Sequence, residues 1–305
     1  MSTLKAQIEA IITASGATAM GVAIKHLESG EEIYLNADQP VPLCSVFKIP
    51  VMAEAFHQID AGRFTLDDRW ELTLAEKNLP SGILVFLQDG LLPTVRDLLT
   101  LMIIISDNTA TDMVMHRLGV ASTTKFMHEL GLTDIHVPMT VRDIFNDIMG
   151  EADSDPRKAF TNLDKPQPEG SSNRSGNAYS LGSDNDVGTP RALNQLNEMI
   201  FRGEVVNRAA CDQMLHILLQ QQLNLRLPRF LPEGTPVAHK TGTLGGIRND
   251  SGIIYCNDHA HVAVTVFCTW DVVAVKDDPV AEWDRINALD SAIGQIGRLV
   301  YEHFK

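Results

Sequence analysis

The sequence is poor in cysteine, has no long hydrophobic run and carries no excess of basic residues. It has four cysteines in 305 residues, without a CxxC pair or a histidine spacing typical of structural zinc sites. No apolar run approaches the roughly 20 residues that a membrane helix needs. The formal net charge of -14 would repel phosphate backbones at long range. We therefore expect no metal, no cofactor, no membrane span and no nucleic-acid partner.

The remaining composition is that of an ordinary globular protein. Hydrophobic residues make up 44% and charged residues 21%, which argues against disorder, collagen-like repeats and coiled coils. The length suits one catalytic unit, or two interleaved subdomains that share a core. Cys256 and Cys268 lie in apolar runs, where a buried free thiol is common, so we expect reduced cysteines.

The first ten residues show no basic stretch, apolar core or cleavage site of an export signal. A cytoplasmic location is therefore expected for the chain as numbered. A periplasmic or secreted location is expected if a leader was removed.

Hydrophobic periodicity predicts strands near both ends of the chain and helices between them. A helix is expected at the N-terminus, followed by strands at 20–24 and 32–35. Residues 66–130 show helical spacing. Later elements are expected as helices at 190–201, 209–220 and 281–301 and as strands at 237–240, 252–256 and 262–268. This order favours an α/β (α+β) fold in which both ends share an antiparallel sheet flanked by helices, with an inserted all-helical subdomain.

Residues 150–186 are rich in Gly, Ser, Asn, Asp and Pro, which predicts one long loop. Loops longer than about 15 residues are uncommon in compact domains and are usually functional or disordered. We expect either a cover over the active site or a disordered segment.

Ser45 and Lys48 stand three residues apart at the start of an apolar helical stretch. On a helix this spacing places a hydroxyl and an amine on the same face. A serine becomes a nucleophile when a base takes its proton, and a lysine is such a base only when burial or positive charge lowers its pKa. The tetrad predicts an activated serine, although an S-x-x-K sequence also occurs by chance.

Two further polar segments follow apolar runs. Ser106-Asp107-Asn108 interrupts a hydrophobic stretch, where Ser106 could relay protons and Asn108 could bind an amide. Ser106 or Asp107 could equally be the N-cap of the next helix. In Lys240-Thr241-Gly242-Thr243, after a predicted strand, the glycine would let a substrate approach the backbone closely.

S-x-x-K, S-D-N and K-T-G in this order resemble the signature of class A β-lactamases and penicillin-binding proteins. The order of expected elements resembles that family along nearly the whole chain. The resemblance implies a single β-lactamase-like catalytic unit over residues 1–305. Its α/β subdomain would comprise 1–64 and 215–305, and its helical subdomain 65–214 would include a long loop at 147–188.

The resemblance also implies a role for each catalytic residue. Ser45 would be the nucleophile and Lys48 its general base or proton shuttle, while Ser106 would pass the proton to the leaving nitrogen. Asn108 would hold the side-chain amide of the substrate. The backbone NH groups of Ser45 and Thr243 would form the oxyanion hole.

The K-T-G segment would bind the substrate. By resemblance, Lys240 would provide a positive field, and Thr241 and Thr243 would hydrogen-bond a substrate carboxylate beside Gly242. Arg248 would support that carboxylate, although it is equally well explained as an exposed arginine in a turn.

The family's E-x-x-L-N segment, whose glutamate activates the deacylating water, is missing. Arg142 falls where the glutamate should be, and Asn146 matches the asparagine. Asp143, Asp147 and Glu151 could replace the glutamate, or they could be ordinary surface acids.

Two neighbouring features bear on this departure. Asp186 opens a segment that resembles the end of the family's loop, and pairing with Arg142 would anchor it. Cys44 occupies the place of a disulfide cysteine in some carbapenem-hydrolysing relatives. The expected partner is absent, since Leu244 and Gly245 follow the K-T-G segment, so Cys44 is expected to be a small buried packing residue.

The sequence thus predicts a serine hydrolase that acts through a covalent acyl-enzyme on a small-molecule amide or ester. β-Lactamase-type amide hydrolysis is the leading hypothesis. An esterase, amidase or D,D-peptidase-like hydrolase on the same scaffold is a second. A slow-deacylating penicillin-binding protein is a third, because loss of the water-activating base leaves acylation intact.

Overall fold

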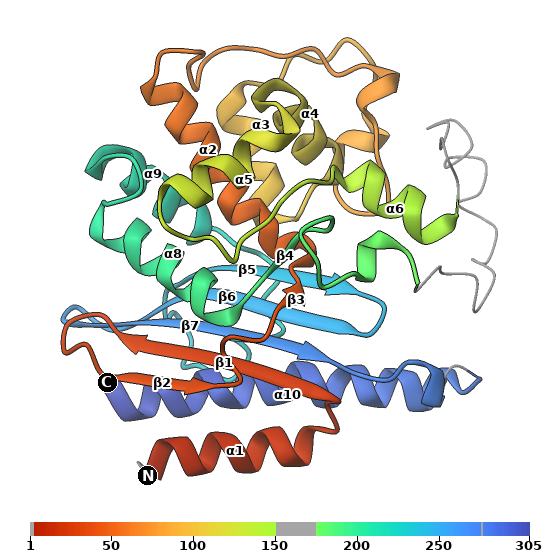
Figure 1. Ribbon diagram of the computed structural model, residues 1–305. Coiled ribbons are helices and arrows are strands. Elements are labelled where there is room, and N and C mark those ends of the chain that lie inside the picture. Colours follow the sequence, from red (N-terminus) through yellow and green to blue (C-terminus); the bar gives the residue numbers. More distant parts are fainter. Residues whose placement is uncertain (1–2, 151–174, 276) are drawn as a thin grey trace.

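The computed structural model describes residues 3–150, 175–275 and 277–305 (Figure 1). Its centre is a five-stranded sheet in the order β2-β1-β7-β6-β5, in which every pairing is antiparallel. The strands are β1 (Ala19–His26), β2 (Glu32–Leu35), β5 (Val237–Leu244), β6 (Ile247–Asn257) and β7 (Ala260–Thr269). Because β1 pairs with β7, the two ends of the chain share one sheet, as predicted.

Side chains alternate between the two faces of this sheet. Val264 and Val266 of β7 are fully buried toward one face, and Phe267 toward the other. The first face is covered by α10 (Pro279–Phe304), and α1 (Thr3–Ser15) lies alongside α10 (Figure 1). Apolar residues of both helices join the strands in one core.

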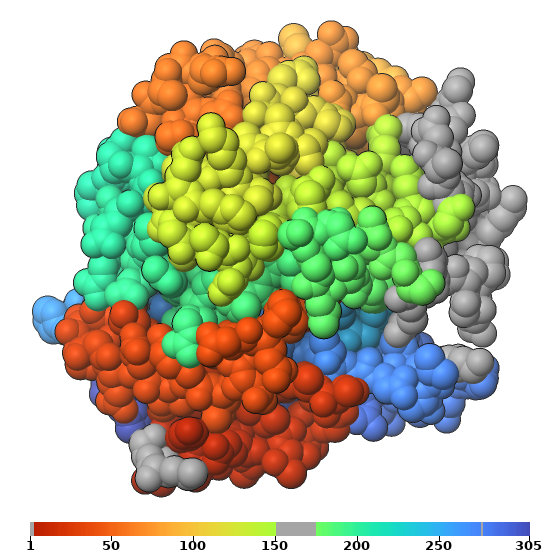
Figure 2. Space-filling view, in the orientation of Figure 1, coloured from red at the N-terminus to blue at the C-terminus, as the bar shows by residue number. Residues whose placement is uncertain are grey.

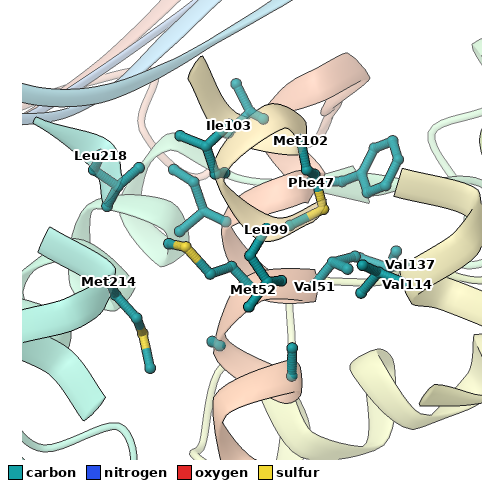
Figure 3. Packing of buried hydrophobic residues seen from close by; sticks show 14 of the residues in the cluster. Phe47, Val51, Met52, Leu99, Met102, Ile103, Val114, Val137, Met214 and Leu218 are labelled. Carbon is teal, nitrogen blue, oxygen red and sulfur yellow. The ribbon is translucent and has the colours of Figure 1, made fainter. Parts of the chain in front are cut away.

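The opposite face carries the larger core. There α8 (Pro190–Arg202) packs on β1, β6 and β7, and α2 (Lys48–Asp60) runs away from the sheet into the helical half (Figure 1). Val51 and Met52 of α2 pack with Leu99 of α3 (Val95–Ile104) and with Met214 of α9 (Arg208–Leu218) (Figure 3). The apolar helix expected behind Ser45 is therefore buried at the centre of this core.

Shorter elements connect these layers. The remaining helices are α4 (Asn108–Leu118), α5 (Val120–Glu129) and α6 (Val141–Met149), together with the single turns η1 (Cys44–Phe47), η2 (Leu74–Glu76), η3 (Leu84–Phe86), η4 (Asn177–Tyr179) and η5 (Val273–Val275). β3 (Val41–Pro42) and β4 (Val187–Gly188) form a two-stranded ribbon. It pairs the segment just before Ser45 with the segment just before α8.

Nearly the first half of the region predicted to be helical, residues 66–130, is irregular. Between residues 66 and 94 the structure has only η2 and η3. Pro80, Gly82, Gly90 and Pro93 interrupt this stretch, and both residue types disfavour a helix interior. Hydrophobic spacing alone therefore gave the wrong prediction there.

The predicted loop at 147–188 is shorter than expected at both ends. Residues 147–149 continue α6, while η4 and β4 order the far end. Residues 151–174 lie outside the described residues. The predicted division into two subdomains stays a prediction.

Figure 2 shows the N-terminal and C-terminal segments together at one end of the molecule, with the central helices forming the other end. In the described ranges, no helix combines the length and hydrophobicity needed to cross a membrane.

Candidate active site

Ser45 lies in the tight turn η1, immediately before α2. Cys44 before it has a φ of 48°, a left-handed conformation that non-glycine residues rarely adopt. Strand β5 passes close to this turn: a Cβ on Gly242 would lie 2.5 Å from the carbonyl oxygen of Leu43. Gly242 was predicted to make room for substrate, whereas here the chain's own backbone occupies that space.

Lys48 is fully buried at the start of α2. Its Nζ donates to the carbonyl oxygen of Ser106 at 2.8 Å, to Ser106 Oγ at 3.0 Å and to Asn108 Oδ1 at 2.9 Å. Burial lowers the pKa of Lys48 to about 7, although the charges of Asp107 and Asp112 act to raise it. Burial therefore acts in the direction that a role of Lys48 as a base requires.

Ser106 brings the two predicted lysines together. Its Oγ accepts a bond from Lys48 at 3.0 Å and one from Lys240 at 3.1 Å. Burial, reinforced by the charge of Lys48, holds the pKa of Lys240 well below its usual range. Ser106 has a φ of 59°, a conformation that costs energy in a non-glycine residue and is often found at functional sites.

Ser45 Oγ makes no hydrogen bond with any described residue, and the three acceptors around Lys48 Nζ all belong to residues 106 and 108. A lysine ammonium has three donors and no acceptor. A neutral Lys48 amine would have a free lone pair for the Ser45 proton. Hydrogen bonds of catalytic groups are often long in unliganded structures and tighten when substrate binds.

Asp107 fixes the turn that presents Ser106 and Asn108. It is the N-cap of α4, where its Oδ1 accepts from the N–H of Ala110 at 2.9 Å. Its Oδ2 accepts from the N–H groups of Ile83 and Leu84 at 2.7 and 2.9 Å. The capping interpretation of this segment is confirmed, and the cap also orients the two polar residues beside it.

A pocket of about 290 Å³ lies above these groups. The predicted residues that line it are Ser45, Ser106, Asn108, Thr241 and Thr243. The two lysines are not on the lining but reach it through their bonds to Ser106. Larger open hollows beside α5 and between α1 and α10 contain none of the predicted site residues.

Arg248 does not line this pocket. Its guanidinium donates to the carbonyl oxygens of Leu244 and Ile247, in the turn between β5 and β6. It is only 8% exposed, so neither the substrate-binding prediction nor the exposed alternative describes its position.

Arg226, which sequence reasoning missed, occupies the place beside the K-T-G segment. Its guanidinium donates to Thr243 Oγ1 at 2.6 Å, to the carbonyl oxygen of Gly242 at 2.8 Å and to Asp290 Oδ1 at 2.7 Å. The next residue is tied to β6, because the N–H of Leu227 donates to the buried Asp250 at 3.0 Å. Arg226 stands in a loop without a motif, so no local signal could have identified it.

The predicted pair of Arg142 and Asp186 is wrong. Arg142 donates to the carbonyl oxygens of Ala75 and Lys77 at 2.6 and 3.1 Å, which are free because residues 74–77 form only one short turn. Asp186 instead accepts from the N–H of Met139 at 3.0 Å.

The acids proposed to replace the missing glutamate have other partners. Asp143 forms a capping box with Thr140 at the start of α6, and Asp147 accepts from the N–H of Ala178 at 2.8 Å. Neither lines the pocket, and Glu151 lies outside the described residues. The Oδ1 of Asn146 is buried without a partner among the described residues.

The α6 wall of the pocket is apolar. It is formed by Val141, Ile144 and Phe145. The helix is held at its start by Asp112, which accepts from the N–H groups of Val141 and Arg142 at 2.8 and 3.0 Å. Burial raises the pKa of Asp112 to about 6, while these two bonds act to lower it.

All four cysteines are free, as expected. Cys44 is half-buried, and burial raises the pKa of its thiol to about 12. Across the described ranges, no group of three or more His, Cys, Asp or Glu side chains gathers as a metal site would require.

The sequence model of the group described as "Beta-lactamase enzyme family" matches residues 3–304. The extended-spectrum β-lactamase PER-1 of Pseudomonas aeruginosa is 27% identical over 309 residues, covering 98% of this chain and 86% of that protein. The crystal structure of a β-lactamase from Sphaerobacter thermophilus is 27% identical with a TM-score of 0.75, covering 98% and 97% of the two chains. An ancestral class A β-lactamase is 26% identical with a TM-score of 0.76, covering 99% and 100%. The predicted fold is thereby confirmed, and the chain belongs to the β-lactamase enzyme family.

Proposed function

We propose that this protein hydrolyses β-lactam-type cyclic amides through a covalent acyl-enzyme on Ser45. The observation that carries the proposal is the contact of Lys48 and Lys240 with one hydroxyl, Ser106 Oγ, at the base of the pocket that Ser45 lines. Membership of the β-lactamase family supports a hydrolase with small β-lactam substrates.

In the acylation step, neutral Lys48 takes the proton of Ser45 Oγ, which attacks the carbonyl carbon of the substrate. The backbone NH groups of Ser45 and Thr243 stabilise the oxyanion that forms. Ser106 then gives a proton to the leaving nitrogen and takes one from the Lys48 ammonium, which returns Lys48 to its neutral form. The ring opens and the acyl group stays on Ser45.

Substrate binding depends on the part of the pocket formed by β5. Thr241 and Thr243 line it there, and Arg226 holds the Thr243 hydroxyl from behind. The guanidinium of Arg226 supplies positive charge behind Thr243, which suits a substrate carboxylate. Asn108 lines the pocket on the other side and would bind the side-chain amide.

A slow-deacylating penicillin-binding protein is the second candidate. The observation that favours it is the apolar α6 wall of Val141, Ile144 and Phe145, on the segment where relatives carry the water-activating glutamate. Acylation would be unaffected by this wall, because the groups that carry it out lie on η1, on α2, in the turn between α3 and α4, and on β5.

The test is intact-protein mass spectrometry over time with a chromogenic cephalosporin, comparing the native protein with Ser45→Ala while colour release is followed. An adduct on the native protein alone, which disappears as colour accumulates, is the expected result. A lasting adduct would favour the penicillin-binding candidate. No adduct and no Ser45-dependent colour would refute both and direct the search to esters and peptides.

A further inference from the structure

Asp186 is fixed beside the turn that carries Ser45. Its carbonyl oxygen accepts from the N–H of Leu43 at 2.8 Å, at the end of the ribbon formed by β3 and β4. Its N–H donates to the side chain of Asn185 at 2.7 Å, and both residues line the pocket with Ser45. The backbone of Asp186 is therefore bonded to the residue that directly precedes the nucleophile's turn, two residues before Ser45.

The side chain of Asp186 has one oxygen committed and one without a partner. Oδ1 accepts from the N–H of Met139 at 3.0 Å. Oδ2 is buried and has no hydrogen-bond partner among the described residues, and the whole residue is 1% exposed. Buried polar atoms in native proteins nearly always have a partner, so an unpaired one on a residue that lines a pocket calls for an explanation.

Among the described residues that line this pocket, Asp186 is the single carboxylate. Asp143 is engaged with Thr140 and Asp147 with Ala178. In the described part of the chain, Asp186 thus combines a position on the pocket with an uncommitted basic oxygen.

We propose that Asp186 holds the deacylating water at Oδ2 and takes its proton, in place of the glutamate that this chain lacks. This inference rests on the proposed acyl-enzyme mechanism at Ser45. It assigns the second half-reaction to a residue of the 185–188 segment instead of α6.

The step balances with one water. As the water oxygen attacks the carbonyl carbon of the acyl group on Ser45, one water proton goes to Asp186 Oδ2. Collapse of the tetrahedral intermediate breaks the bond between this carbon and Ser45 Oγ, and that oxygen takes up the proton from Asp186. The product is a carboxylic acid, and both side chains return to their starting states.

The surroundings of Asp186 make it a stronger base than an exposed aspartate. Burial raises its pKa well above the usual range, the Met139 N–H opposes this, and the negative charges of Asp112 on α4 and Asp143 on α6 add to the rise. On the η1 side, the charge of Asp186 acts on the thiol of Cys44, whose pKa burial raises to about 12. A general base works best when its pKa approaches the working pH.

The test compares the native protein with Asp186→Asn in the same mass-spectrometric time course. Asparagine keeps an Oδ1 that can accept from Met139 N–H but removes the basic oxygen. Asp184→Asn is the matched control, because Asp184 is an exposed acid of the same segment that contacts Ser180. Acylation and deacylation rates are measured separately, the latter after removal of free substrate.

We expect Asp186→Asn to acylate within about 3-fold of the native rate and to deacylate at least about 100-fold more slowly, the usual effect of losing a general base. Native deacylation should fall as pH falls, and this dependence should vanish in Asp186→Asn. Unchanged deacylation, or an equal loss of both rates in a folded variant, would overturn the assignment. Failure of the native protein to acylate would refute the proposed function itself and is a separate outcome.

Discussion

The amine of Lys48 illustrates how one residue's environment sets its chemistry. Its side chain is buried, and the cost of burying an ammonium group exceeds the attraction of Asp107 and Asp112, so its pKa falls to about 7. Below that pH the group is an ammonium and cannot accept a proton. Above it, the amine has a lone pair for the Ser45 proton.

The acylation rate should therefore rise with pH and level off above about 7. We would measure the acylation rate by rapid mixing between about pH 5 and about pH 9. This range lies below the usual lysine pKa of about 10.4, so an ordinary lysine would stay charged throughout it. Lys48→Arg is the matched variant: it keeps the charge but cannot lose a proton in this range, and it should acylate at least about 100-fold more slowly. A rate that is flat across neutral pH would contradict the base assigned to Lys48.

The same lysine affects stability with a definite sign. Its folded-state pKa lies below the unfolded value, so the unfolded chain binds more protons between these two values and stability rises with pH through that window. The burial cost of the charged form is present in full below the folded pKa.

Between elements, Arg226 makes the contacts that matter most for the pocket edge. One guanidinium joins the loop before β5 to Gly242 and Thr243 on that strand, to β6 through the carbonyl oxygen of Asn249, and to Asp290 on α10. Asp290 is 7% exposed, and Arg226 is its hydrogen-bonded partner, while Arg248 lies farther away at 4.0 Å.

Arg226→Ala should lower the free energy of unfolding by about 3–5 kcal/mol, since it removes the hydrogen-bonded partner of a buried carboxylate and leaves only the longer contact with Arg248 at 4.0 Å. It should also raise KM more for substrates with a carboxylate than for analogues without one. Chemical denaturation and steady-state kinetics provide the two measurements. Arg298→Ala on α10 is the control, because Arg298 pairs with Glu302 at the surface and should change stability by less than about 1 kcal/mol. Equal effects of the two variants would refute this role for Arg226.

Asp107 makes a second set of contacts between elements. Asp107→Ala removes the cap of α4 and leaves the N–H groups of Ile83 and Leu84 without their acceptor. We expect a loss of about 2–4 kcal/mol, larger than the roughly 1 kcal/mol of a lone N-cap. Thr94→Ala, at the exposed cap of α3, provides that reference. Equal shifts of the denaturation midpoint in Asp107→Ala and Thr94→Ala would contradict this prediction.

These contacts also show why sequence could predict only part of the site. Ser45, Lys48, Ser106 and the K-T-G residues lie in local motifs, so their chemistry and spacing can be read along the chain. Arg226 acquires its role only in the folded protein, where its loop contacts β5, β6 and α10. No local sequence pattern indicates these contacts. Asp186 was noticed, but its partner was misassigned because the carbonyl groups freed by irregular residues 74–77 could not be foreseen.

The overall fold was easier to predict, because both cores leave a periodic pattern in the sequence. Strands show alternation of apolar residues, and helices show apolar residues every three to four positions. Alternation along β1 and β7 directs side chains to both faces of one sheet, and the amphipathic α1 and α10 provide a cover for one of them. The helix prediction was wrong at residues 66–94, which pack as a loop near α3 and α4. The apolar spacing of this stretch is compatible with a helix or with a loop.

Because the sheet belongs to both cores, we expect the whole molecule to unfold in a single transition. Leu99→Ala in the helical core and Ile293→Ala in the core beneath α10 each remove a fully buried side chain and should cost about 2–5 kcal/mol. Both should lower the same calorimetric peak, whereas Val280→Ala, at a site that is 70% exposed, should leave it unchanged. Two separate peaks, each moved by only one of the variants, would instead mean that the helical region at 65–214 unfolds independently. A shared peak would show that the helices that carry Lys48 and Asn108 and the strand that carries Lys240 are stabilised together, so a loss of packing at either end of the molecule would also weaken the active site between them.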